Sequence, residues 1–167
     1  MNFQKTKPLY QEGDWFAIPI EDGEYAVGLI ARMKNGRGTK SIFGYFFGPR
    51  RNKIPKLDEL TELLPEHNID MCRFGDLGLH EGSWPVIGRF NDWDRSKWPM
   101  PPFLRTQLVS GITFKVTYDD TDPGSRISET ECDPKEASKY PKDGLSGSGA
   151  VEKYLALKLK NSNDGSI

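Results

Sequence analysis

The first third of the chain alternates apolar runs with turn residues, as in a meander of β-strands. The segments "GDWFAIPI" and "EYAVGLIARM" are joined by "EDG", and acidic-Gly pairs supply the positive φ that tight hairpins require. A third apolar run, "SIFGYFFG", follows the Gly-rich turn "NGRGTK". We therefore expect strands over residues 15–18, 25–33 and 42–47, with Trp15 and Ala17 near the core.

Alternation of apolar and polar positions continues in the middle of the chain. It is clearest in "GITFKVTYDD", which predicts a strand over residues 112–118. The runs "DMCRFGDLGL" and "WPVIGRF" predict two shorter strands, the second over residues 86–90. We expect Trp84, Val86 and Ile87 to line or border the core, with Gly88 allowing a close backbone approach.

Two segments have helical rather than strand periodicity. In "IPKLDELTELLPEHNI", leucines recur at positions 57, 60 and 64 before Pro65, which predicts a helix near residues 55–64. In "DPKEASKYP", Asp133 is suited to the N-cap and Pro134 to the first position of a short helix.

The segment "YPKDGLSGSGAVEKYLALKLK" passes from a Gly-rich loop into a Leu- and Lys-rich run. Over residues 151–159 the apolar positions fit either a helix or a strand, and the abundance of Ala, Glu, Lys and Leu favours a helix after Ser148. A Gly-rich loop before a helix can bind phosphate, but no GK[ST] or third glycine follows at the required spacing. We interpret the loop as a turn that leads into a terminal helix.

These elements predict an α+β fold: a strongly bent, largely antiparallel, barrel-like β-sheet with two to three short helices. We expect a flexible N-terminus over residues 1–11, a single domain over residues 12–160 and a disordered tail over residues 161–167.

Candidate catalytic chemistry is sparse. His67 and His80 lie in turn-like polar segments, and Cys72 and Cys132 form no CxxC or metal-ligand spacing. A pair of Cys72 with a histidine is conceivable, but Cys72 lies within an apolar strand-like run. We expect ordinary buried or half-buried thiols, no enzyme, no metal site and no cofactor.

Localisation follows from the lack of hydrophobic segments. No apolar run follows an N-terminal basic patch, and none approaches the ~20 residues of a membrane helix. We expect a soluble protein in a reducing compartment, without membrane contact.

Charge is distributed in two opposite poles although the formal net charge is only -1. Residues 32–56 carry eight basic residues and no acidic one, whereas residues 119–136 carry seven acidic residues and two basic ones. The poles either compensate each other, or one of them meets a charged macromolecule.

A Pro-rich loop, "NDWDRSKWPMPPF", contains Trp93 and Trp98 among charges. The two rings either fold back over the core or are exposed anchors of the kind that dominate protein interfaces.

Four segments taken in order, "GDWFAIPIEDGEYAVGLIAR", "GYFFG", "GSWPVIGRF" with a following "MPPF", and "DGLSGSGAVE", resemble immunity protein 26 of bacterial polymorphic-toxin systems. The resemblance covers roughly residues 12–152. Trp84, Gly88 and residues 149–152 match positions that we interpret as fold determinants. The resemblance implies a small cytoplasmic protein that binds and blocks a cognate toxin domain.

Under this hypothesis the toxin has a basic cleft, as many nucleases do, and the acidic pole and tryptophan loop bind it. The candidate partner-binding residues are Asp92, Trp93, Asp94, Trp98, Asp119, Asp120, Asp122, Glu129 and Glu131. The alternative is an SH3-like module that binds nucleic acid through the basic residues 32–56. Its phosphate contacts would be Arg37, Lys40, Arg50 and Arg51, and its stacking residues would come from Phe43, Tyr45, Phe46 and Phe47.

Overall fold

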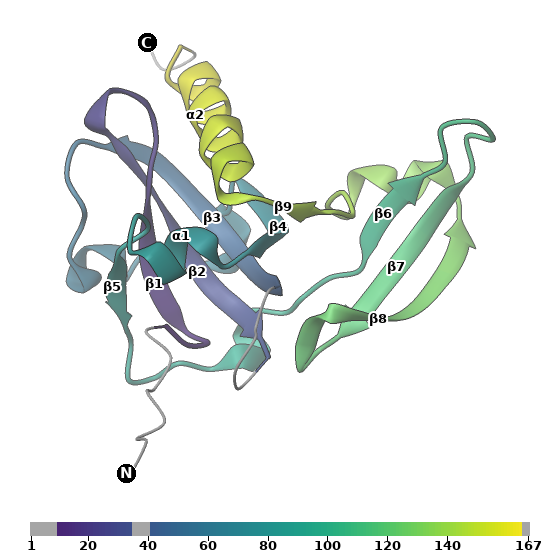
Figure 1. The fold of residues 1–167 in the computed structure, drawn as a ribbon, viewed down its shortest axis with the longest axis horizontal. Helices are drawn as coiled ribbons and strands as arrows, with labels where there is room; N and C mark the ends of the chain where they lie inside the picture. Colours follow the sequence, from purple (N-terminus) through teal and green to yellow (C-terminus); the bar gives the residue numbers. More distant parts are fainter. Residues whose placement is uncertain (1–9, 35–40, 165–167) are drawn as a thin grey trace.

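The structure, a computed structural model, describes residues 10–34 and 41–164. The predictions for residues 1–9 and 165–167, at the two ends of the chain, fall outside the described residues. The described part has two sheets and two α-helices, which confirms the α+β class (Figure 1).

The larger sheet has six strands in the order β5-β1-β2-β3-β4-β9. Its strands are β1 (Asp14–Pro19), β2 (Tyr25–Met33), β3 (Ser41–Arg51), β4 (Asp70–Gly75), β5 (Val86–Arg89) and β9 (Leu145–Ser146). Neighbouring strands are antiparallel except β4 and β9, and register shifts in the β1–β5 and β2–β3 pairs bend the sheet. The sheet stays open between β5 and β9, so it is not closed into a barrel as the term barrel-like suggested.

The smaller sheet has the order β6-β7-β8 and is antiparallel throughout. It consists of β6 (Phe103–Thr106), β7 (Thr113–Asp119) and β8 (Asp122–Cys132). In Figure 1 these green strands stand to the right of the larger sheet and extend away from it.

Both faces of the larger sheet are covered, which explains why residues 15–18 are buried without alternation. Phe16, Phe46, Phe74 and Trp84 form one core cluster with residues of the helices α1 (Leu77–Glu81) and α2 (Ser148–Asp164). The second cluster lies on the other face and includes Trp15, Leu29, Phe43, Tyr45, Phe47 and Leu60, together with Phe103, Val116 and Tyr118 of the smaller sheet. The smaller sheet is thus attached through the second cluster.

The terminal segment is helical, as predicted. Val151, Leu155 and Leu159 are buried at helical spacing, whereas Leu157 is 60% exposed. Strand alternation would have placed all four on one face. The helix continues past Lys160 to Asp164.

The predicted helix near residues 55–64 is wrong. Only a 3₁₀ turn forms, Leu57–Leu60, and Leu57, Leu60 and Leu63 contact the second cluster at a spacing of three, whereas Leu64 is exposed. A segment this short between two prolines gains too little from α-helical hydrogen bonds to offset nucleation, so the contacts with the core decide its conformation.

Two expectations for residues 70–90 also need correction. The run "DMCRFGDLGL" is a strand only to Gly75, and Leu77–Glu81 forms α1. Trp84 is buried and Ile87 packs against the core as predicted, but Val86, on the edge strand β5, is 39% exposed. Gly88 allows the expected close approach, since a Cβ atom there would lie 3.2 Å from Leu57 Cδ2.

The short helix at Pro134–Ser138 was predicted correctly as to its start, although it is of the 3₁₀ type. The Asp133 side chain accepts a hydrogen bond from Lys135 N at 2.9 Å, and Pro134 occupies the first turn. Cys72 and Cys132 are free, half-buried thiols, as expected, and burial raises the pKa of Cys72 well above its ordinary value.

Candidate partner-binding site

Trp98 lies at the end of the loop 91–98, called the tryptophan loop here, and packs over the second core cluster. The loop forms because the Asp94 carboxylate accepts hydrogen bonds from Ser96 N (3.0 Å) and Ser96 Oγ (2.6 Å), which begins the 3₁₀ turn Arg95–Lys97. The Trp98 ring then meets Trp15 and Tyr45 edge-on, with centroids 5.9 and 5.2 Å apart. Tyr45 holds the next residue by donating its hydroxyl to Pro99 O.

Trp93 is half-buried at the other end of the same loop, against the start of β1. Its ring occupies the space beside Gly13, where a Cβ atom would lie 2.8 Å from Trp93 Cγ. Gly13 also has a φ of +95°, a conformation that favours glycine. The first of the two alternatives for the tryptophans therefore holds, because both rings fold back over the core. Both rings also keep part of their surface exposed.

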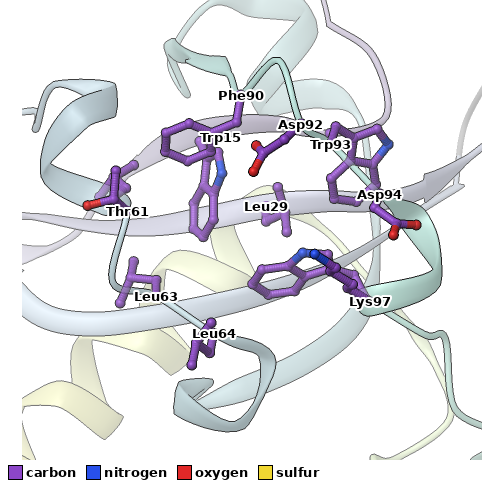
Figure 2. A pocket seen from close by; sticks show the side chains of 13 residues that line it. Trp15, Leu29, Thr61, Leu63, Leu64, Phe90, Asp92, Trp93, Asp94 and Lys97 are labelled. Carbon is purple, nitrogen blue, oxygen red and sulfur yellow. The ribbon is translucent and has the colours of Figure 1, made fainter.

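The two tryptophans border a pocket of about 170 Å³. Trp15, Leu29 and Leu60 contribute apolar surface to it, and the charged residues that line it are Asp92, Asp94 and Lys97. Figure 2 shows the Asp92 carboxylate between the rings of Trp15 and Trp93 in this view. The loop thus combines aromatic surface with two carboxylates around one hollow.

Arg95 connects this loop to the turn between β7 and β8. Its Nη1 lies 2.8 Å from Asp120 Oδ2, its Nη2 donates to Asp120 O at 2.7 Å, and its Nε donates to Glu12 at 3.2 Å. The hydrogen bond with Glu12, together with the charges of Glu12 and Asp120, raises the pKa of Arg95. The buried Arg32 completes the junction, because it pairs with Asp120 Oδ1 at 2.8 Å and donates to Arg95 O at 3.1 Å.

The aspartates of the turn differ in how far they are neutralised. Burial acts to raise the pKa of Asp120, but hydrogen bonds and charges from Arg32 and then Arg95 outweigh it and hold the pKa below its ordinary value. The pKa of Asp119 is lowered by hydrogen bonds from Thr121 N and Oγ1. Asp122 accepts a hydrogen bond from Gly124 N at 3.0 Å. Asp120 is thus part of an ion-pair network, whereas no ion pair is found for Asp119 or Asp122 within the described residues.

The structure therefore brings together most of the residues proposed from sequence. The loop with Asp92, Trp93, Asp94 and Trp98 is joined to the turn with Asp119, Asp120 and Asp122 through Arg95. Glu129 and Glu131 lie further along β8. Glu129 is paired with Arg105 and with Arg126, and Glu131 stands opposite Phe114 in the strand register.

Sequence reasoning missed Arg95, Arg32 and Glu12, which hold the two segments together. Their partners are 83 and 88 residues away in two of the contacts, so no local spacing indicates them. The only indication in the sequence was the presence of one basic and one acidic pole. The Arg32–Asp120 ion pair joins the two poles, which is the first of the two alternatives given for them.

The nucleic-acid alternative loses its stacking surface. Phe43, Phe46 and Phe47 are fully buried and Tyr45 is nearly so, because β3 lies in the middle of the larger sheet. Of its phosphate contacts, Arg37 and Lys40 lie outside the described residues, and Arg50 lies 3.5 Å from the Glu24 carboxylate. A buried aromatic ring cannot stack on a base.

Catalytic or metal-binding chemistry would need titratable side chains close together in residues 10–34 and 41–164. His67 Nδ1 accepts a hydrogen bond from Leu64 N at 3.1 Å and thereby closes its own turn. No three His, Cys, Asp or Glu side chains of these residues are grouped so that they could hold a metal ion. None of the helices described is both long and apolar enough to cross a membrane.

Residues 10–34 and 41–164 form an α+β domain in which the acidic and aromatic loop 91–98 is joined to the turn 119–122. The family model for immunity protein 26 matches residues 11–114, more than half of the chain, and the chain belongs to this family. Its general role is therefore the neutralisation of a toxin. No curated protein and no solved structure matches the chain.

Proposed function

We propose that this protein binds a cognate toxin domain of a bacterial polymorphic-toxin system in the cytoplasm and blocks it by direct contact, without catalysis. Family membership supports the general role. The contact surface we propose is the junction surface, defined as the loop 91–98 together with the turn 119–122.

The observation that carries this proposal is the ion pair between Arg95 and Asp120. It fixes two acidic segments, remote in sequence, into one surface. Asp92 and Asp94 on the loop, and Asp119 and Asp122 on the turn, are all at least partly exposed. The half-buried rings of Trp93 and Trp98 add the aromatic area that anchors protein interfaces.

The chemistry of this surface also indicates the kind of toxin. Four carboxylates that are at least partly exposed, two of which line the aromatic pocket, complement a positively charged cleft, such as the phosphate-binding active site of a nuclease. Occupying that cleft would exclude its substrate. Glu131, at the far end of β8, adds a carboxylate beyond the junction surface, whereas Glu129 is neutralised by Arg105 and Arg126.

Binding kinetics with the purified toxin domain test the proposal. The probe is the variable C-terminal domain of a large secreted protein, once a gene for such a protein is identified next to this one. Asp92→Lys with Asp122→Lys should slow association about tenfold at low ionic strength and flatten its salt dependence, because charge acts mainly on the encounter. Asp120 is left unchanged, since a lysine there would face the buried Arg32.

A matched control changes the net charge equally at another place. Glu66 and Glu81 are exposed and lie outside the junction surface, so Glu66→Lys with Glu81→Lys should leave the association rate close to that of the natural protein. Trp93→Ala should instead speed dissociation. Equal association rates for the two charge variants would refute the junction surface as the contact, and a natural protein that neither binds nor neutralises the domain would refute the function.

A further inference from the structure

The hairpin that joins β6 to β7 has an apolar tip. Leu108 and Val109 are 101% and 103% exposed, whereas every other large apolar residue of the described chain keeps at least about a third of its surface covered. From Thr106 to Phe114 the chain has no charged residue. Figure 1 shows this hairpin at the outer end of the smaller sheet, away from the larger sheet. A partner that covered these two adjacent aliphatic side chains would remove their whole apolar surface from water, which is favourable.

The tip is held in one conformation by its own hydrogen bonds. Gln107 N donates to Ile112 O and Gly111 N donates to Gln107 O, both at 2.9 Å. Ser110 Oγ donates to Gln107 Oε1 at 2.8 Å and accepts from Ile112 N at 3.3 Å. Gly111 supplies the positive φ of +73° that closes the turn. A loop ordered before binding loses little conformational entropy when it binds.

The base of the hairpin is rigidly attached to the body of the protein. Arg73 of β4 is buried, donates to Pro123 O at 3.1 Å, and lies over the Tyr118 ring. Phe103 and Val116 are fully buried in the second core cluster. Leu108 and Val109 therefore project from a hairpin whose base is packed into the core.

The charges beside the tip limit what can cover it. Glu131 and Asp133 are exposed at the end of β8 that lies next to the hairpin, where Cys132 pairs with Thr113. Two copies of the chain meeting tip to tip would bring these like charges together, and an anionic lipid surface would repel them. A protein pocket that is apolar inside and basic at its rim complements both features.

We propose that Leu108 and Val109 form an anchor that enters an apolar, basic-rimmed pocket on the toxin domain. This inference rests on the proposed function and adds a second contact to it. The tip and the turn 119–122 lie at opposite ends of β7, roughly 20 Å apart for a strand of this length. An interface of ordinary size covers about 800 Å² on each partner, so one toxin domain can reach both.

The test is Leu108→Ser with Val109→Ser, measured against the toxin domain encoded by the adjacent gene. Both side chains are fully exposed, so the variant should unfold at the same temperature as the natural protein. Its Kd should rise about a hundredfold, mostly through faster dissociation, as for anchor residues at the centre of an interface. Amides of residues 106–113 should exchange more slowly with deuterium in the complex than in the free protein.

The control variant is Leu77→Ser with Leu157→Ser, two exposed leucines on α1 and α2, whose buried sides cover the opposite face of the larger sheet. It should bind as tightly as the natural protein. An unchanged Kd for the tip variant, with the natural protein binding tightly, would overturn the anchor alone. A natural protein that fails to bind the domain would overturn the function and the anchor together. Self-association that disappears in the tip variant would assign the tip to a second copy and overturn the anchor on the toxin.

Discussion

Arg73 of the larger sheet lies over the ring of Tyr118 of the smaller sheet, with its guanidinium carbon 3.6 Å from the ring centroid. The Tyr118 hydroxyl donates to Asp143 Oδ1 at 2.6 Å, and Arg73 Nη2 lies 3.3 Å from the same oxygen. Three segments, β4, β7 and the chain before β9, are thus joined by one buried cation. The position of the smaller sheet depends on it.

Arg73→Ala should lower the free energy of unfolding by about 3–5 kcal/mol, since it removes one partner of a buried ion pair and leaves Asp143 without its cation. Urea denaturation measures this. Arg126→Ala is the control, because its pair with Glu129 is largely exposed and should be worth less than about 1 kcal/mol. Similar denaturation midpoints for the two variants would show that Arg73 does not hold the sheets together.

The stability of the protein should fall as the pH rises from about 10 to about 12. Burial raises the pKa of Tyr45 to about 12 despite the opposing charge of Arg32, whereas the ordinary value is 10.0. The phenol is then protonated in the folded state and ionised in the unfolded state over this window, so its contribution is complete below pH 10 and lost as the pH passes through 12. Burial, together with a hydrogen bond to Asp143, raises the pKa of Tyr118 to about 12 as well.

The measurement is the free energy of unfolding at pH 9 and at pH 11.5. Tyr45→Phe should lose less stability between these values than the natural protein does, since one of the titrating groups is gone. All other ionisable groups are the same in both proteins, so the difference between them isolates Tyr45. Equal losses in the two proteins would contradict the raised pKa.

Gly13→Ala should destabilise the protein and alter its tryptophan fluorescence. A methyl group there would meet the Trp93 ring at 2.8 Å in a backbone conformation with φ of +95°. Gly23→Ala is a matched control, because Gly23 has a φ of +70° but nothing within 4 Å of the added carbon. We expect about 1 kcal/mol for Gly23→Ala and about 1–3 kcal/mol more for Gly13→Ala, from thermal unfolding. If both cost the same, Trp93 does not lie against Gly13.

No useful binding of nucleic acid is expected. The aromatic residues of β3 are buried, and Arg32 is paired with Asp120. A gel-shift titration with mixed-sequence DNA and RNA at low ionic strength is the most sensitive check, because phosphate contacts are strongest there. Micromolar binding that weakens steeply with salt would support the alternative that the protein binds nucleic acid.

Local pattern was sufficient where a continuous apolar run or an alternation of apolar and polar residues marks the element. Strands β2, β3 and β7 follow their apolar residues closely, and α2 follows its leucines. Strand β8 was not predicted because both of its faces are polar, so its sequence does not alternate between apolar and polar residues. Ile127 is its single large apolar residue, and it is exposed. The pairing of β8 with β7, and not its own composition, makes it a strand.

The candidate site shows the same division. Its tryptophans and aspartates could be found as a cluster of residue types within two short segments. That the segments touch depends on Arg95 reaching Asp120 and on Arg32 being buried beneath both. Such contacts depend on how the two sheets pack against each other. No periodicity in the sequence indicates that packing.

The hairpin tip between β6 and β7 contributes no side chain to either core cluster. Residues 107–110 can therefore be exchanged for another sequence of equal length at little cost in stability, provided that Gly111 is kept for its positive φ. If Leu108 and Val109 are the anchor proposed above, the choice of toxin and the stability of the fold depend on different residues. A graft of this loop from one immunity protein to another of the same architecture should transfer part of its preference for a toxin, which makes the tip a natural starting point for redirecting the protein to a new target.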